Sequence, residues 1–186
     1  MRLDENLNLI IPVPRGAQGI FVHVAPLSRP VFETHWLVIA KTFALINAEG
    51  LSVISGPRVA GLALKTMAKQ MGVWDGAEGV ERTLLAEIVR LSNVVQPGAA
   101  GWETVPMAVA LEKGTFSERE RAEVMGAAVF FTVLSAMHRT ETLTPILQAT
   151  GDLWGTRTTS SSATEFAASL RTSTVTENTG ATAAVT

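Results

Sequence analysis

Three histidines are the residues of this sequence best suited to chemistry at neutral pH, namely His23, His35 and His138. Glu33 stands two residues before His35, so a carboxylate and an imidazole could share a metal ion. However, the sequence lacks the His-x-x-x-His pair that places two ligands on one helix face. We therefore interpret His23 as a strand residue, His35 as part of a polar helix face, and His138 as a helix C-terminal residue, where positive charge is favourable.

Motifs for nucleophilic or phosphate chemistry are also missing. Cysteine is absent, and neither Gly-x-Ser-x-Gly nor Ser-x-x-Lys occurs. The run Ser55-Gly56-Pro57-Arg58 precedes a predicted helix but lacks the Gly-Lys-Ser/Thr ending of a P-loop. Glu118, Glu120 and Glu123 stand at the start of another predicted helix, where they interact favourably with the helix dipole. We therefore expect no catalytic site, no metal and no cofactor.

Charge and hydropathy argue against nucleic acid and membrane as partners. The formal net charge is -2, which does not favour a polyanion. Arg58, Lys65 and Lys69 share one predicted helix face, but no aromatic residue lies among them to stack on a base. The longest apolar run, Val124 to Met137, would span about 21 Å as a helix at ~1.5 Å per residue, less than the roughly 30 Å of a bilayer core. A buried core helix explains this run better.

Apolar periodicity predicts a mainly α fold, a compact domain of about five helices over residues 1–155 with a short N-terminal β-hairpin. The hairpin covers residues 3–25, where two apolar runs flank a turn and prolines favour an edge position. Ser117 and Glu120 have the spacing of a capping box. The helices are expected over about 31–48, 57–72, 79–95, 105–112 and 117–138, with a last short one at 143–148.

The tryptophans have two possible roles. Trp36 belongs to a helical stripe with Phe32 and Phe43, which we interpret as core. Trp74, Trp102 and Trp154 each stand in a predicted loop beside or near a glycine. Loop tryptophans either close the end of a helical bundle or bind a partner, and packing against short apolar helices favours the first role.

Residues 156–186 differ sharply in composition, because fifteen of them are Ser or Thr. Such a segment cannot bury enough apolar surface to offset its chain entropy, so we expect a flexible tail. One patch is an exception: Ser162 is a possible helix cap, and Phe166 and Leu170 follow at i and i+4 spacing. We predict that Phe166 and Leu170 bind a protein partner as two turns of helix.

The order of several segments resembles the tail assembly chaperones of long-tailed (siphovirus-type) bacteriophages. The likeness covers most of the chain but contains no chemically specific motif. It is carried by the segments 40–43, 56–60, 91–95, 101–106, 129–133, 154–155 and 164–170, followed by Thr172-Ser173-Thr174.

The resemblance implies a non-enzymatic function in the host cytoplasm. Such proteins keep the tape measure protein soluble, recruit tail tube subunits to it, and leave before the virion is complete. The family often makes a longer product by a translational frameshift. Two alternatives stay open: a permanent virion component, such as a head–tail joining or tail-completion protein, and a small ligand-binding or regulatory domain. The oligomeric state is also open.

Overall fold

The computed structural model describes residues 2–3, 8–15, 19–50, 55–99, 101–138 and 162–177. Its helices are α1 (Arg29–Ala48), α2 (Gly56–Gln70), α3 (Leu84–Arg90), α4 (Met107–Glu112), α5 (Glu118–Met137) and α7 (Ala163–Glu177). Its strands are β1 (Arg2–Leu3), β2 (Leu9–Val13), β3 (Ile20–Val24), β4 (Ser92–Gly98) and β5 (Gly101–Pro106).

The strands form one antiparallel sheet in the order β1-β2-β3-β4-β5. The N-terminal hairpin pairs Leu9 with Val24 and Val13 with Ile20. β4 then aligns beside β3, with Phe21 opposite Val95, and β5 folds back along β4. The sheet order therefore follows the order of the strands along the chain, and α1, α2 and α3 lie in the connection between β3 and β4.

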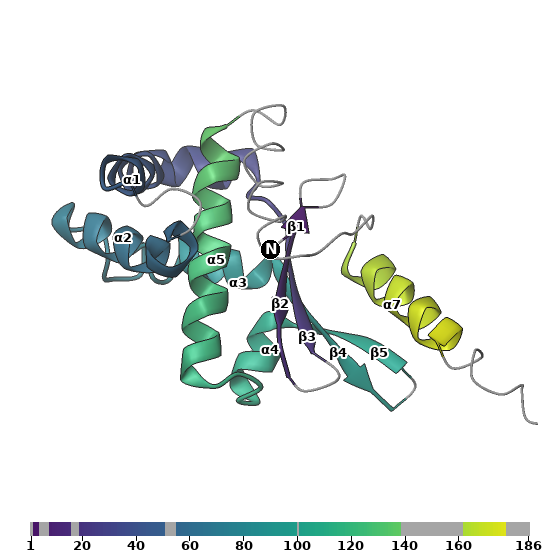
Figure 1. Ribbon diagram of the computed structural model, residues 1–186. Coiled ribbons are helices and arrows are strands. Elements are labelled where there is room, and N and C mark those ends of the chain that lie inside the picture. Colours follow the sequence, from purple (N-terminus) through teal and green to yellow (C-terminus); the bar gives the residue numbers. More distant parts are fainter. Residues whose placement is uncertain are drawn as a thin grey trace, which may run out of the picture.

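Four layers follow one another across the molecule (Figure 1). Helices α1 and α2 lie on one side, α5 stands between them and the sheet, and α7 lies on the far side of the sheet. The strands carry apolar residues at both parities, as expected for a sheet that is covered on both faces. We call the face toward α5 the inner face and the face toward α7 the outer face.

The main core lies between the inner face and the helices. Val22, Val24 and Val94 project into it from the strands, and Phe130 and Phe131 project from α5. α5 is apolar around most of its circumference in its C-terminal half, which is typical of a buried helix. Its Gly126 lies directly against the backbone of Pro57 at the start of α2, so the two helices approach closely.

Several local predictions are confirmed. The hairpin lies within residues 3–25, α1 and α2 fall at their predicted positions, and α5 ends next to His138. The capping box is present, with the Ser117 hydroxyl accepting the amide of Glu120 and the Glu120 carboxylate accepting the amide of Ser117. The predicted helix at 143–148 lies outside the described residues.

The predicted helix over 79–95 is wrong at both ends, because residues 79–83 form a bend and turns and no helix continues beyond Arg90. α3 covers only seven residues, and the chain then enters β4, while the predicted loop around Trp102 is β5. Val94 and Val95 are β-branched and pair with β3, and this pairing outweighs their helical spacing in the sequence. The fold is thus mainly α as predicted, but its sheet is larger than a hairpin.

The tryptophans divide between the two roles. Trp74 is buried, with the Lys65 Nζ 5.3 Å from its ring centroid, as expected for a residue that closes the bundle. Trp36, predicted as core, is instead 54% exposed. Val38, Ile39 and Thr42 are instead the buried residues of α1 near Trp36. The Thr42 hydroxyl donates a hydrogen bond to the Val38 carbonyl oxygen at 2.7 Å. Trp154 lies outside the described residues.

The segment 156–186 contains a helix where we predicted a flexible tail. α7 covers Ala163–Glu177 and contacts β4 and β5. The prediction considered the segment in isolation, whereas the sheet supplies the apolar surface that the segment lacks. Residues 156–161 and 178–186 lie outside the described part of the chain.

Candidate protein-binding surfaces

The outer face of the sheet is an apolar surface built from alternate residues of four strands. Ile10 and Val95 are buried there, and Phe21 and Trp102 are partly buried. The sheet register places Phe21 opposite Val95, and Pro97, the next residue of β4 on the same face, opposite Trp102. The rings of Phe21 and Trp102 lie 5.6 Å apart between centroids. These two aromatic side chains are the largest on this face.

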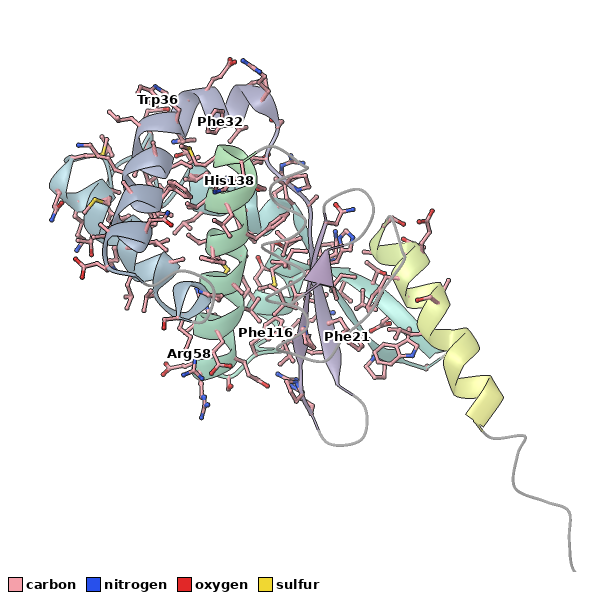
Figure 2. The ribbon with its side chains drawn as sticks, turned by 45° about the horizontal axis from the view of Figure 1, so that its top comes forward. Phe21, Phe32, Trp36, Arg58, Phe116 and His138 are labelled. Atoms are coloured by element: carbon pink, nitrogen blue, oxygen red, sulfur yellow. The ribbon has the colours of Figure 1, made fainter. Side chains whose placement is uncertain are left out.

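Helix α7 packs on this outer face through one side. Ala163, Phe166 and Ala167 are buried against the sheet, and Leu170 is partly buried beside them. The Phe166 ring meets the Phe21 ring edge-on, with centroids 5.0 Å apart and planes at 80°, a favourable aromatic geometry. Figure 2 shows Phe21 on the side of the strands that faces α7. The structure therefore brings the predicted binding residues Phe166 and Leu170 onto the chain's own sheet.

A groove of about 530 Å³ runs between α3, α4 and α5. Its apolar wall consists of side chains that are partly buried on the helices and of one exposed proline. They come from all three helices and from the end of β5: Leu85, Val89, Pro106, Leu111 and Met125. Because these side chains remain accessible, a second apolar surface could pack on them.

Charged residues form the rim of this groove, namely Glu81, Arg90 and Arg121. Arg90 is held in place by Glu87, whose carboxylate accepts two hydrogen bonds from its guanidinium at 2.6 and 2.7 Å. These bonds also lower the pKa of Glu87. The rim therefore presents Arg121, the paired Arg90 and Glu87, and Glu81 around an apolar floor.

A second cavity, of about 300 Å³, lies between β2 and the first turns of α2 and α5. One wall contains Glu120, which accepts bonds from Arg15 at 2.7 and 2.9 Å. Hydrogen bonds from Arg15 and Ser117 lower the pKa of Glu120 to about 2. Arg15 also donates to the Thr115 carbonyl and lies 5.9 Å from the centroid of the Phe116 ring. This network fastens the hairpin to α5, so we assign it a structural role.

An apolar patch is exposed on α1, where Trp36 and Leu37 are 54% and 41% exposed. Figure 2 shows Trp36 on α1, whereas Phe32 of the same helix is partly buried against the main core. Exposed tryptophan is enriched at protein interfaces. The patch lines neither of the two cavities, so it contributes less to a specific binding site.

The three histidines lie in three different chemical environments. His23 is buried in β3, and partial burial lowers the pKa of His35 on α1. His138 follows α5, and its ring packs on Phe43 with centroids 5.2 Å apart. Within the described ranges, no three His, Cys, Asp or Glu side chains gather closely enough to hold a metal ion. None of the helices described combines the length and apolar character needed to cross a membrane.

Sequence reasoning missed both binding surfaces and found only the helix that occupies one of them. One signal for the outer face was present: Ile20, Phe21 and Val22 are consecutive apolar residues, so β3 had to be covered on both faces. The groove had no comparable signal, because it depends on the relative position of three helices. Comparison with known proteins finds no matching family model, curated protein or solved structure.

Proposed function

We propose that this chain is a non-enzymatic tail assembly chaperone of a long-tailed bacteriophage, acting in the host cytoplasm on tape measure protein and tail tube subunits. The observation that carries the proposal is the apolar groove between α3, α4 and α5. A chaperone for a long helical protein needs such a groove at a helix seam, where an amphipathic helix can place its apolar side.

The groove suits a helix with one apolar stripe. Leu85 and Val89 are one helical turn apart on α3 and form a ridge along one wall. Met125 lies on α5, and its flexible thioether side chain adapts to partners of different shape. A chaperone that must release its client benefits from such an adaptable surface.

The rim charges add a preference for acidic residues beside that stripe. Arg121 and Arg90 stand at the rim with Glu81, and Arg90 is already paired with Glu87, so Arg121 contributes most of this preference. A partner helix with Asp or Glu next to its apolar residues would place them near the guanidinium groups. The resemblance to tail assembly chaperones implies that the tape measure protein supplies this helix.

Co-purification of the full chain with tape measure protein tests the proposal. Val89→Glu places a charge in the groove and should reduce the recovered tape measure protein at least tenfold. Leu62→Glu is the matched control, because Leu62 is 67% exposed on α2 and lines neither cavity. Arg121→Glu, an exposed charge reversal on the rim, should weaken binding without any change in the core.

Phage complementation then connects binding with assembly. The Val89→Glu chain should yield heads without tails, whereas Leu62→Glu should support normal tails. Unchanged binding by both Val89→Glu and Arg121→Glu would refute the groove as the site. Mass spectrometry separates the main alternative: a chaperone is present in infected-cell lysate and absent from purified virions, whereas a head–tail joining or tail-completion protein persists in the virion.

A further inference from the structure

The contact between α7 and the outer face is separate from the main core. The main core contains the inner-face residues and side chains of α1 to α5, whereas none of residues 163–170, the part of α7 whose side chains are described, belongs to it. The outer-face cluster is small, with Ile10 and Val95 from the sheet and three buried residues from α7. Loss of the α7 contact would therefore leave the packing of the main core in place.

Within this small cluster, α7 relies on one large side chain. Phe166 is 1% exposed, and its ring contacts the Phe21 ring. The small side chains of Ala163 and Ala167 allow the helix backbone to approach the sheet. Leu170 extends the same side by one turn. The pattern is small, aromatic, small and aliphatic at positions i, i+3, i+4 and i+7, which lies on one helix face.

Apart from Ala168 and Val175, the remaining residues of α7 are polar, and short helices of this kind are marginal in water without a surface to pack on. A helix that is stable only when it packs on another surface is readily replaced there by a second helix with the same side chains. The outer face itself carries two aromatic rings and two buried aliphatic side chains, and the register places the buried His23 on the same side, opposite Ile10. The part of this face that α7 covers is apolar, so it selects by shape and apolar contact. An occupant therefore needs an aromatic residue between two small ones and no charge on that side.

From these observations we infer that the outer face is a docking site for a partner's amphipathic helix of the pattern small-x-x-aromatic-small-x-x-aliphatic, and that α7 is its intramolecular competitor. The partner helix replaces α7, with its aromatic residue in the place of Phe166 against Phe21. While α7 is docked, the face is closed to partners. This site is distinct from the groove between α3, α4 and α5, so the inference stands without the proposed function.

Competition predicts a measurable penalty on binding in trans. The apparent affinity of a partner helix is reduced by the fraction of molecules in which the face is open. A chain whose α7 is docked nine-tenths of the time or more binds a partner helix at least about tenfold more weakly than a chain with a free face. Weakening α7 should therefore strengthen binding of an external helix.

A synthetic peptide with the sequence of residues 160–177 is the probe, labelled with a fluorophore at its N-terminus. Its binding is measured by fluorescence anisotropy with four full-length chains: the parent, Phe166→Ala, Thr164→Ala, and Phe166→Ala combined with Trp102→Ala. Thr164 is exposed on the same helix and is the matched control. We expect Phe166→Ala to bind the peptide at least tenfold more tightly than the parent, and Thr164→Ala to bind like the parent.

The combined variant should lose the peptide, because Trp102 belongs to the face rather than to α7. Equal peptide binding by the parent and Phe166→Ala would overturn the inference, as would a peptide carrying Phe166→Ala that binds as well as the original. Unfolding of the Phe166→Ala chain would show that α7 is part of the core and would overturn it too. Light scattering measures the oligomeric state of the same chains. If the parent is a dimer and the Phe166→Ala chain is a monomer, α7 is exchanged between copies instead of competing within one chain, which would also overturn the inference.

Discussion

Replacing Gly126 by alanine should destabilise the protein, although alanine normally favours a helix over glycine. Gly126 lies inside α5, and a Cβ atom built on it would stand less than 3.0 Å from the Pro57 carbonyl oxygen on α2. The carbonyl oxygen is part of the backbone and the Cβ atom is bonded directly to it, so no side-chain rotation relieves the overlap. The helices themselves have to move apart.

The magnitude follows from two opposing contributions. Alanine gains about 1 kcal/mol over glycine in a helix interior. Restoring normal van der Waals spacing requires the helices to separate by about 1 Å, which loosens dispersion contacts along the seam of α2 and α5. Forced insertion of a methyl group into a packed core costs about 1–3 kcal/mol, and more where the backbone is rigid. We expect a net loss of about 2 kcal/mol for Gly126→Ala.

Gly61→Ala is the matched control on the facing helix. A Cβ atom at Gly61 would lie 3.9 Å from the Gly126 Cα, which is ordinary contact. This substitution should therefore keep the helix-propensity gain and stabilise the protein by up to about 1 kcal/mol. The same chemical change on two facing helices thus has opposite signs.

Urea denaturation followed by far-UV circular dichroism measures both variants, and an unchanged slope shows that the denatured state is the same. The Gly126→Ala midpoint should fall and the Gly61→Ala midpoint should rise relative to the parent. If Gly126→Ala is as stable as the parent, α2 and α5 do not approach as closely as described, and the reasoning fails.

Three further predictions concern α5. Ser117→Ala removes the capping hydroxyl and should cost about 1 kcal/mol in the free energy of unfolding, while an unchanged value would show that the cap is not formed in solution. Phe130→Ala should cost about 3–5 kcal/mol, because the buried ring leaves a cavity; a loss near zero would place the ring outside the core. The pKa of Glu120 in the folded protein is about 2, below its usual value. The ionised carboxylate therefore stabilises the folded state, by on the order of 1 kcal/mol for a part-exposed pair. This contribution is present above about pH 4.5 and is lost as the pH falls toward 2. Thermal melts from pH 5 to pH 2 should show a smaller decline for Glu120→Gln than for the parent, and identical slopes would contradict the ion pair with Arg15.

The sequence by itself determined the elements whose signals are local. Ser117 and Glu120 are three residues apart, so the capping box and the start of α5 need no information from the rest of the chain. The hairpin of β2 and β3 is equally local, because its strands are joined by a short turn. The i, i+4 spacing of Phe166 and Leu170 was also evident, and it indicated two helical turns on a partner within a segment that we expected to be flexible.

Tertiary structure decided what those elements face. Val94 and Val95 fit a helix by spacing, and only the presence of β3 beside them makes β4 the better solution. Trp36 is exposed because α1 is rotated to place Thr42 inside, a rotation set by its packing on α2 and α5. The groove and the outer face have the same origin: each combines side chains from elements far apart in sequence, and periodicity shows which side of an element is apolar without showing what it packs against.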